Sequence, residues 1–300
     1  MKNRSFSKLL IYLQLLRVKS WPKNFFLFVP LVFSKHVLHG DYFITAVIGF
    51  FIFSLASSAI YIVNDIADAP KDALHPVKKF RPIAGGTVSR NNAIIIDAVL
   101  FIALIFFSFK MNPAFIAIMW IYIVINMCYS AFLKNIVIVD LFCIASGFML
   151  RVLAGAYLIS VSISNWLILT TMFLSLFLAV MKRRVEIAGN SNASLQRSVL
   201  KEYTINFTDQ IGAMSGSCVI LSYALYSVAD RTVKFFGSED LVFTSLFVIF
   251  GIFRYMYLVY KKDMGEDVVE VLFTDLPMII NVLLYIAAIL YIIYFKRIIL

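Results

Sequence analysis

Residues 64–86 read NDIADAPKDALHPVKKFRPIAGG, a polar stretch between long apolar segments. Its three aspartates, Asp65, Asp68 and Asp72, are spaced i, i+3 and i+7. At about 100° per residue of an α-helix they lie within roughly 60° of one another, so they share one face. Clustered carboxylates repel one another unless a cation neutralises them, and Mg²⁺ is commonly held by one or two carboxylates together with substrate phosphates. The stretch therefore predicts a Mg²⁺ site at these three aspartates.

Basic residues follow the aspartates within the same stretch. Lys78, Lys79 and Arg81 are cations of the kind that the phosphates of a substrate would need. A solvated loop between helices is the alternative interpretation, since runs of charge usually mark a surface. Because acids and then cations follow one another in this particular order, we favour a phosphate-binding site.

The composition indicates a polytopic membrane protein. The chain has 300 residues, of which 62% are hydrophobic and 16% aromatic, and no soluble domain can bury so much apolar surface. Its three cysteines lie inside apolar runs and have neither disulfide nor zinc-binding spacing. The basic amino terminus lacks a small-residue cleavage site, so we expect no removable signal peptide. We attribute the net charge of +10 to membrane topology and expect no nucleic-acid partner.

We expect one all-α integral membrane domain over residues 1–300, because the sequence contains no long linker or strand-like alternation. Apolar segments of spanning length predict about nine transmembrane helices. Their expected ranges are 25–40, 43–63, 92–109, 114–133, 136–160, 165–181, 210–229, 241–260 and 277–295.

The distribution of lysine and arginine predicts the orientation. With a cytoplasmic amino terminus, nineteen of these cations lie on the cytoplasmic side and six on the other, in agreement with the positive-inside rule. This arrangement places three polar loops, at about 64–91, 182–209 and 262–276, on one face. We therefore expect a multi-pass protein of the cell inner (plasma) membrane with its active site facing the cytoplasm.

Charged residues also occur within the expected spans, where an ionised group is costly without a partner or a polar cavity. Asp140 and Arg151 project on one face of their helix but are roughly 16 Å apart along it, too far for an ion pair. For Asp140 and Arg254, an interhelical salt bridge and a functional role remain equally open. For Arg151 we favour a phosphate ligand, because a guanidinium offers two parallel donors to an anion.

The second polar loop begins with Lys182 and Arg183, directly after an apolar span. Such a cluster either anchors the chain to anionic headgroups or clamps a lipid-borne phosphate. Glu186 follows at helical spacing and can orient one of the two cations. We favour the phosphate clamp.

These residues together resemble the UbiA superfamily of intramembrane prenyltransferases, whose first motif is Asn-Asp-x-x-Asp-x-x-x-Asp. Here that motif is Asn64, Asp65, Asp68 and Asp72. The branch that the chain resembles is the decaprenyl-phosphate phosphoribosyltransferases. The features that suggest this branch are His75-Pro76, Lys78, Arg81-Pro82-Ile83-Ala84, Trp21-Pro22-Lys23-Asn24, Tyr129-Ser130, Leu133-Lys134, Gly147-Phe148, Leu150-Arg151, Lys182-Arg183 with Glu186, and Phe253-Arg254-Tyr255.

The resemblance implies a UbiA-type helical bundle and a Mg²⁺-dependent reaction. A 5-phosphoribosyl group would pass from phosphoribosyl diphosphate to a polyprenyl (decaprenyl-type) phosphate and diphosphate would leave, for the synthesis of cell-envelope polysaccharide precursors. Asp65, Asp68 and Asp72 would be the catalytic and metal-binding residues. The substrate-binding residues would be Lys23, Asn64, Lys78, Lys79, Arg81, Tyr129, Lys134, Arg151, Lys182 and Arg183.

One departure from the wider superfamily separates the alternatives. Prenyltransferases of this superfamily that alkylate an aromatic acceptor with a prenyl diphosphate would carry a second Asp-rich motif, but segment 182–208 contains only Glu186 and Glu202. We therefore prefer the phosphoribosyl reaction and keep the aromatic prenyltransferase as the alternative. A transporter of a phosphorylated solute or lipid is the non-enzymatic alternative. The prenyl chain length, the pathway served and a homo-oligomeric state remain open.

Overall fold

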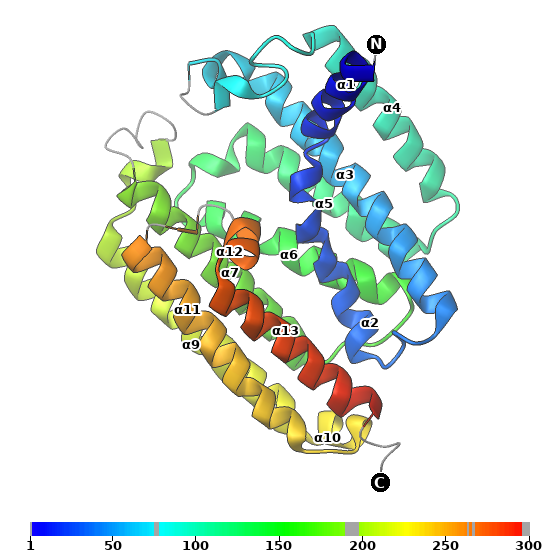
Figure 1. The fold of residues 1–300 in the computed structure, drawn as a ribbon, viewed down its shortest axis with the longest axis vertical. Coiled ribbons are helices and arrows are strands. Elements are labelled where there is room, and N and C mark those ends of the chain that lie inside the picture. Colours follow the sequence, from blue (N-terminus) through cyan, green and yellow to red (C-terminus); the bar gives the residue numbers. More distant parts are fainter. Residues whose placement is uncertain (1, 75–77, 190–197, 263, 266–267, 296–300) are drawn as a thin grey trace.

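The computed structural model describes residues 2–74, 78–189, 198–262, 264–265 and 268–295. Within these ranges every regular element is helical and none is a strand. Figure 1 shows long helices running side by side across the molecule, with short helices near the two ends of the bundle. The all-α prediction is confirmed.

Among the described residues, eight helical segments are long and apolar enough to cross a membrane. They are α3 (Gly40–Asp72), α4 (Arg90–Ser108), α5 (Pro113–Ala131), α6 (Val139–Leu158), α7 (Asn165–Ala188), α9 (Ile205–Val228), η5 with α11 (Asp240–Thr244 and Ser245–Lys262), and α13 with the π-helical turn η6 (Leu276–Leu290 and Tyr291–Phe295). Shorter elements are α1 (Lys2–Leu15), η1 (Val18–Phe28), α2 (Val29–Phe33), η2 (Lys78–Phe80), η3 (Leu133–Asn135), η4 (Ser198–Lys201), α10 (Asp230–Phe236) and α12 (Val268–Thr274). Each of the eight matches one predicted span.

The remaining predicted span, at 25–40, is not a single α-helix. The chain there forms the 3₁₀ segment η1, which contains Pro22, followed by α2. A window of apolar residues does not reveal this, although proline removes a backbone donor and disfavours a continuous α-helix. At about 2.0 Å per 3₁₀ residue and about 1.5 Å per α-helical residue, η1 and α2 together extend roughly 30 Å, the thickness of a hydrocarbon core. This composite segment is long enough for a ninth crossing.

A close backbone contact fixes the composite segment inside the bundle. A Cβ atom placed on Gly155 of α6 would lie 2.0 Å from the carbonyl oxygen of Leu27 in η1. Only glycine permits that approach, and small residues are the usual means by which membrane helices come close together. Leu27 and Leu31 are buried there in a core shared with α3, α5 and α6.

The polar connections lie at one end of the bundle, as predicted. In Figure 1, α7 and α11 end and α9 begins toward the upper left of the view, and α3 ends near the top, whereas α2 and α10 lie at the lower end. The segment expected as loop 64–91 begins as helix, because α3 continues through the acidic motif to Asp72. One end of the protein therefore carries the acidic motif and the basic residues that follow it.

Candidate active site at the acidic motif

The acidic motif occupies the last turns of α3, the longest helix in the described chain. Asp65 and Asp72 are buried, whereas the Asp68 side chain keeps 35% of its surface exposed. The predicted helical spacing is therefore present. The three carboxylates nevertheless meet different partners.

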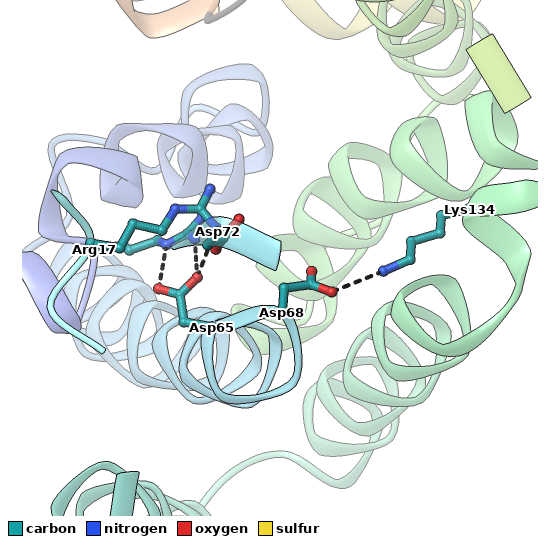
Figure 2. A network of polar contacts seen from close by, with 6 residues as sticks. Arg17, Asp65, Asp68, Asp72 and Lys134 are labelled. Carbon is teal, nitrogen blue, oxygen red and sulfur yellow. Dashed lines mark hydrogen bonds and ion pairs between the residues drawn. The ribbon is translucent and has the colours of Figure 1, made fainter. Parts of the chain in front are cut away.

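Two arginines bind the buried aspartates. Arg81 Nη1 lies 3.1 Å from Asp65 Oδ1 and 2.5 Å from Asp72 Oδ2, so one guanidinium joins the two carboxylates. Arg17 donates to both oxygens of Asp65. Asp68 faces Lys134 instead, with its Oδ1 3.5 Å from Lys134 Nζ (Figure 2). The motif is thus a carboxylate cluster enclosed by three cations from other parts of the chain.

A tight turn after η2 fixes the backbone at Arg81. The amide of Gly85 donates to the Arg81 carbonyl at 2.7 Å, and Gly86 has a φ of +70°, which favours glycine. A Cβ atom on Gly85 would lie 3.0 Å from the Lys79 carbonyl oxygen. The Ala-Gly-Gly sequence that ends the polar stretch is therefore required for the turn that carries Arg81 back toward α3.

Arg17 is a site residue that the sequence interpretation did not select. It lies between α1 and η1 with a φ of 49°, and its guanidinium stacks 4.7 Å from the centre of the Tyr61 ring. Arg17 lies 48 residues before Asp65, so no local sequence pattern predicts the contact between them. Only the unusual turn between two apolar segments brings the residue to α3.

The oxygen donors of this cluster fit Mg²⁺. Among the described residues no group of three or more acidic, histidine or cysteine side chains is gathered closely enough to hold a metal without other ligands. Mg²⁺ does not require such a cage, because it is commonly bound by one or two carboxylates plus substrate phosphates and water. Asp68 is the most accessible carboxylate of the three. The arrangement fits an ion that binds together with a diphosphate.

A second polar network surrounds Arg183, which has no exposed surface. Its Nε donates to Asp140 Oδ2 at 2.7 Å, its Nη1 to Glu186, and its Nη2 to the Tyr129 hydroxyl at 3.1 Å. The Tyr203 hydroxyl donates to the other oxygen of Asp140 at 2.6 Å. Burial, together with this bond, raises the pKa of Tyr203 above its ordinary value. The network is a closed ion-pair cluster.

Arg183 therefore differs from the phosphate clamp that the sequence suggested. Its charge is met by Asp140 and Glu186, and in this arrangement it presents no surface to a substrate. Glu186 orients Arg183, as its helical spacing allowed. Lys182, one residue earlier on α7, is only partly buried.

Arg254, in the span formed by η5 and α11, pairs with an aspartate at the start of α13. Arg254 makes two hydrogen bonds to Asp275, at 3.0 and 2.8 Å, so the interhelical salt bridge is the alternative that the structure supports. The hydrogen bond from Arg254 is the main reason why the pKa of Asp275 lies below its usual value.

Arg151 is buried without a carboxylate partner among the residues that the structure describes. Its guanidinium donates to Asn24, to the Gly147 carbonyl and to the Tyr122 hydroxyl, at 2.6 to 2.9 Å. It thereby joins α6 to η1 and α5. Arg151 is a buried positive charge in the interior of the bundle.

The remaining predicted substrate-binding residues lie in η1, α3 and η2 or close to the two polar networks. Lys23 is in η1, Asn64 in α3, and Lys78 and Lys79 in η2, and of these Lys79 is the most exposed. His75 and Pro76 lie outside the described residues. Tyr129 belongs to the Arg183 network and Lys134 pairs with Asp68 of the acidic motif, although the two residues are only five positions apart in the sequence. The end of α5 and η3 thus connect the two polar networks.

Sequence comparison decides the family. Residues 25–276 match the profile of the UbiA prenyltransferase family. The chain belongs to this family. It is 32% identical over 222 residues to the decaprenyl-phosphate phosphoribosyltransferase of Mycolicibacterium smegmatis, an alignment that covers 72% of this chain and 70% of that protein. It is 31% identical over 218 residues to the protein of the same name from Mycobacterium tuberculosis, covering 71% and 72% of the two chains.

Structural comparison confirms the UbiA-type bundle. A UbiA homologue from Archaeoglobus fulgidus bound to GPP and Mg²⁺ superposes with a TM-score of 0.72 over 94% of this chain and 99% of that chain. The sequence identity of that pair is 17%, so the similarity concerns the fold. This UbiA-family chain is a membrane-embedded transferase.

Proposed function

We propose that this protein transfers the 5-phosphoribosyl group of phosphoribosyl diphosphate to a polyprenyl phosphate of the decaprenyl type, with release of diphosphate. The names of its relatives support this reaction, and so does the cation-lined carboxylate cluster. The product would serve the synthesis of cell-envelope polysaccharide precursors.

One observation favours this reaction over alkylation of an aromatic ring. Of the three carboxylates near the second polar loop, Glu186 binds Arg183 and Asp209 lies 3.3 Å from Arg184. The third, Glu202, is a single exposed side chain, so the described part of this loop carries no acidic cluster. Residues 190–197 contain no acidic residue in the sequence. Two separate acidic sites would suit a prenyl diphosphate donor with two metal ions. A single acidic site beside several cations suits one diphosphate donor and one monophosphate acceptor.

The reaction needs positioning and charge neutralisation more than proton transfer. An oxygen of the acceptor phosphate would form a bond to the anomeric carbon of the donor, while the bond from that carbon to the diphosphate breaks. The acceptor is already anionic at neutral pH, so no general base is required. Catalysis then depends on the alignment of two anionic substrates and on stabilisation of the departing charge.

The residues near the acidic motif supply these functions. Asp65, Asp68 and Asp72 would hold Mg²⁺, which when bound offsets the charge of the diphosphate. Arg81, which is bound to two carboxylates, would exchange them for a donor phosphate, and Lys78 and Lys79 would assist it. Lys134 lies between the acidic motif and the Arg183 network and would face the acceptor phosphate, together with Lys182. Arg183 would hold Tyr129 and Asp140 in position.

We place the active site on the cytoplasmic side of the plasma membrane. In a variant without its native cysteines, a cysteine at the exposed Asn91 is expected to react only with thiol reagents that cross the membrane of intact cells. A cysteine at Asp41, at the opposite end of the bundle, is expected to react with impermeant reagents. The reverse labelling pattern would invert the orientation.

A donor and acceptor test separates the enzyme reactions. Purified protein would be given either phosphoribosyl diphosphate with a polyprenyl phosphate, or a prenyl diphosphate with a hydroxybenzoate. We expect product from the first pair only, and only with Mg²⁺ present. Product from the second pair alone would assign the chain to aromatic prenyl transfer and reject the proposed donor.

A further inference from the structure

A cavity of about 220 Å³ lies at the end of the bundle opposite the acidic motif. It is formed where the turn after α2, the connection between α6 and α7, and α10 come together. Figure 1 shows α2 and α10 at the lower end of the bundle, far from the start of α1. The cavity is therefore separate from the site proposed for phosphoribosyl transfer.

Each polar side chain that lines this cavity can donate a hydrogen bond, and one of them carries a positive charge. Arg231 contributes a guanidinium, and its Nη2 lies 3.1 Å from the Ser162 hydroxyl. His36 and Ser164 add an imidazole and a hydroxyl. No described acidic side chain lines the cavity. An environment with one permanent positive charge and several neutral donors favours an anion.

Two further hydroxyls in the cavity are buried and without a partner. Tyr226 is 4% exposed and so is Thr232, and within the described residues neither side-chain oxygen makes a hydrogen bond. Each oxygen nevertheless retains some accessible surface, since neither is among the fully enclosed polar atoms without a partner. Both residues line the cavity, which leaves their hydroxyls close to its interior. Buried hydroxyls normally have a partner, and here a ligand would supply it.

The walls between these polar groups are aromatic. Phe33, Phe235 and Phe236 line the cavity, and Phe33 packs edge-on against Tyr226 with ring centres 5.8 Å apart. Phe235 is half exposed at this end of the bundle. Aromatic side chains with an adjacent polar group are typical of the region where a membrane meets water.

We infer that this cavity binds an anionic phosphate group, with Arg231 as the charged ligand and Tyr226, Thr232 and Ser162 as hydroxyl donors. A phosphate on a lipid and a free phosphate share this chemistry. The aromatic walls favour the lipid, whose chains would leave the cavity past Phe235.

Native mass spectrometry of the purified full-length chain tests this inference. The probes are dioctanoyl phosphatidic acid, inorganic phosphate and dioctanoylglycerol, a lipid without a phosphate that should not bind. We expect phosphatidic acid to bind, and Arg231→Gln and Tyr226→Phe each to weaken that binding about ten- to a hundredfold, the loss expected for one hydrogen bond to a charged group. Lys234→Gln is the matched control, because it removes an exposed cation of α10 that does not line the cavity. The affinity of this variant for phosphatidic acid should stay within about twofold of the wild-type value.

The outcomes separate the two sources of phosphate. Competition by inorganic phosphate, lost in Arg231→Gln, would assign the cavity to a soluble anion, whereas binding of phosphatidic acid alone would assign it to a lipid. Binding that is unchanged in both Arg231→Gln and Tyr226→Phe would overturn the inference. Tyr226→Phe retains the ring, so it remains informative if Arg231→Gln does not fold. Phosphoribosyl transfer should be unchanged in both variants, which keeps this test independent of the proposed function.

Discussion

Replacing Asp68 with Asn is expected to lower turnover by at least about a hundredfold, the scale seen when a group that stabilises developing charge is removed. Asp68 is the most exposed carboxylate of the acidic motif and has the longest ion pair, 3.5 Å from Lys134. An exposed pair of this kind contributes about 1 kcal/mol or less to stability, so the variant should fold. Initial rates with and without added Mg²⁺, after treatment with a chelator, measure the effect.

The same helix provides the control for this experiment. Asp41 is an exposed aspartate in the first turn of α3, at the opposite end of the bundle, and Asp41→Asn should leave turnover unchanged. Wild-type activity that survives chelation would remove the metal from the proposal. Full activity of Asp68→Asn would remove this carboxylate from the site.

Replacing Arg183 with Met is expected to lower the free energy of unfolding by about 3–5 kcal/mol, because Asp140 would be left buried without its cation. Asp140 and Arg183 are both fully buried, and Arg183 Nε lies 2.7 Å from Asp140 Oδ2. A denaturant titration in mixed micelles measures the change. The double variant Arg183→Met with Asp140→Leu should recover most of it, since the unpaired buried carboxylate is removed as well.

Arg184, the next residue along α7, provides the comparison for the loss of stability. Arg184 pairs with the partly exposed Asp209 at 3.3 Å and also donates to the Val259 carbonyl. Arg184→Met should cost less than Arg183→Met, because the carboxylate that it leaves unpaired remains in contact with water. Suppose instead that Arg183→Met keeps wild-type stability and raises the requirement for polyprenyl phosphate. Arg183 would then be a direct phosphate ligand, as the sequence first suggested, and the structural role given to it here would be wrong.

Hydrophobicity and local spacing predicted most of the fold. Eight predicted spans coincide with helices, because apolar length is what a membrane requires of a helix. The predicted span at 25–40 is instead the 3₁₀ segment η1 followed by the short helix α2. Hydrophobicity does not register this difference, because it takes no account of Pro22, which disfavours a continuous α-helix. The helical register of Asp65, Asp68 and Asp72 was also predicted from their spacing.

Contacts between distant residues were not predictable from a single sequence. Arg17 reaches Asp65 across 48 residues, and Arg183 reaches Asp140 across 43. Residue type suggested that these charges required partners, but only the fold selects the partner. Arg183 was interpreted as an accessible cation because its neighbours in sequence are basic, whereas α7 turns it toward α6. The cavity around Arg231 has no sequence signal, since its lining comes from three parts of the chain far apart in sequence, within residues 30–36, 161–167 and 226–236.

The most direct test of the central proposal is to follow which bond of the donor breaks. Purified protein would be incubated with Mg²⁺, a polyprenyl phosphate and phosphoribosyl diphosphate labelled either at the 5-phosphate or at the terminal phosphate of the diphosphate. We predict that the first label enters the lipid, that the second appears in free diphosphate, and that the lipid gains the mass of one phosphoribosyl group. Recovery of neither label in these products, from protein that is folded and supplied with both substrates, would contradict the proposed reaction.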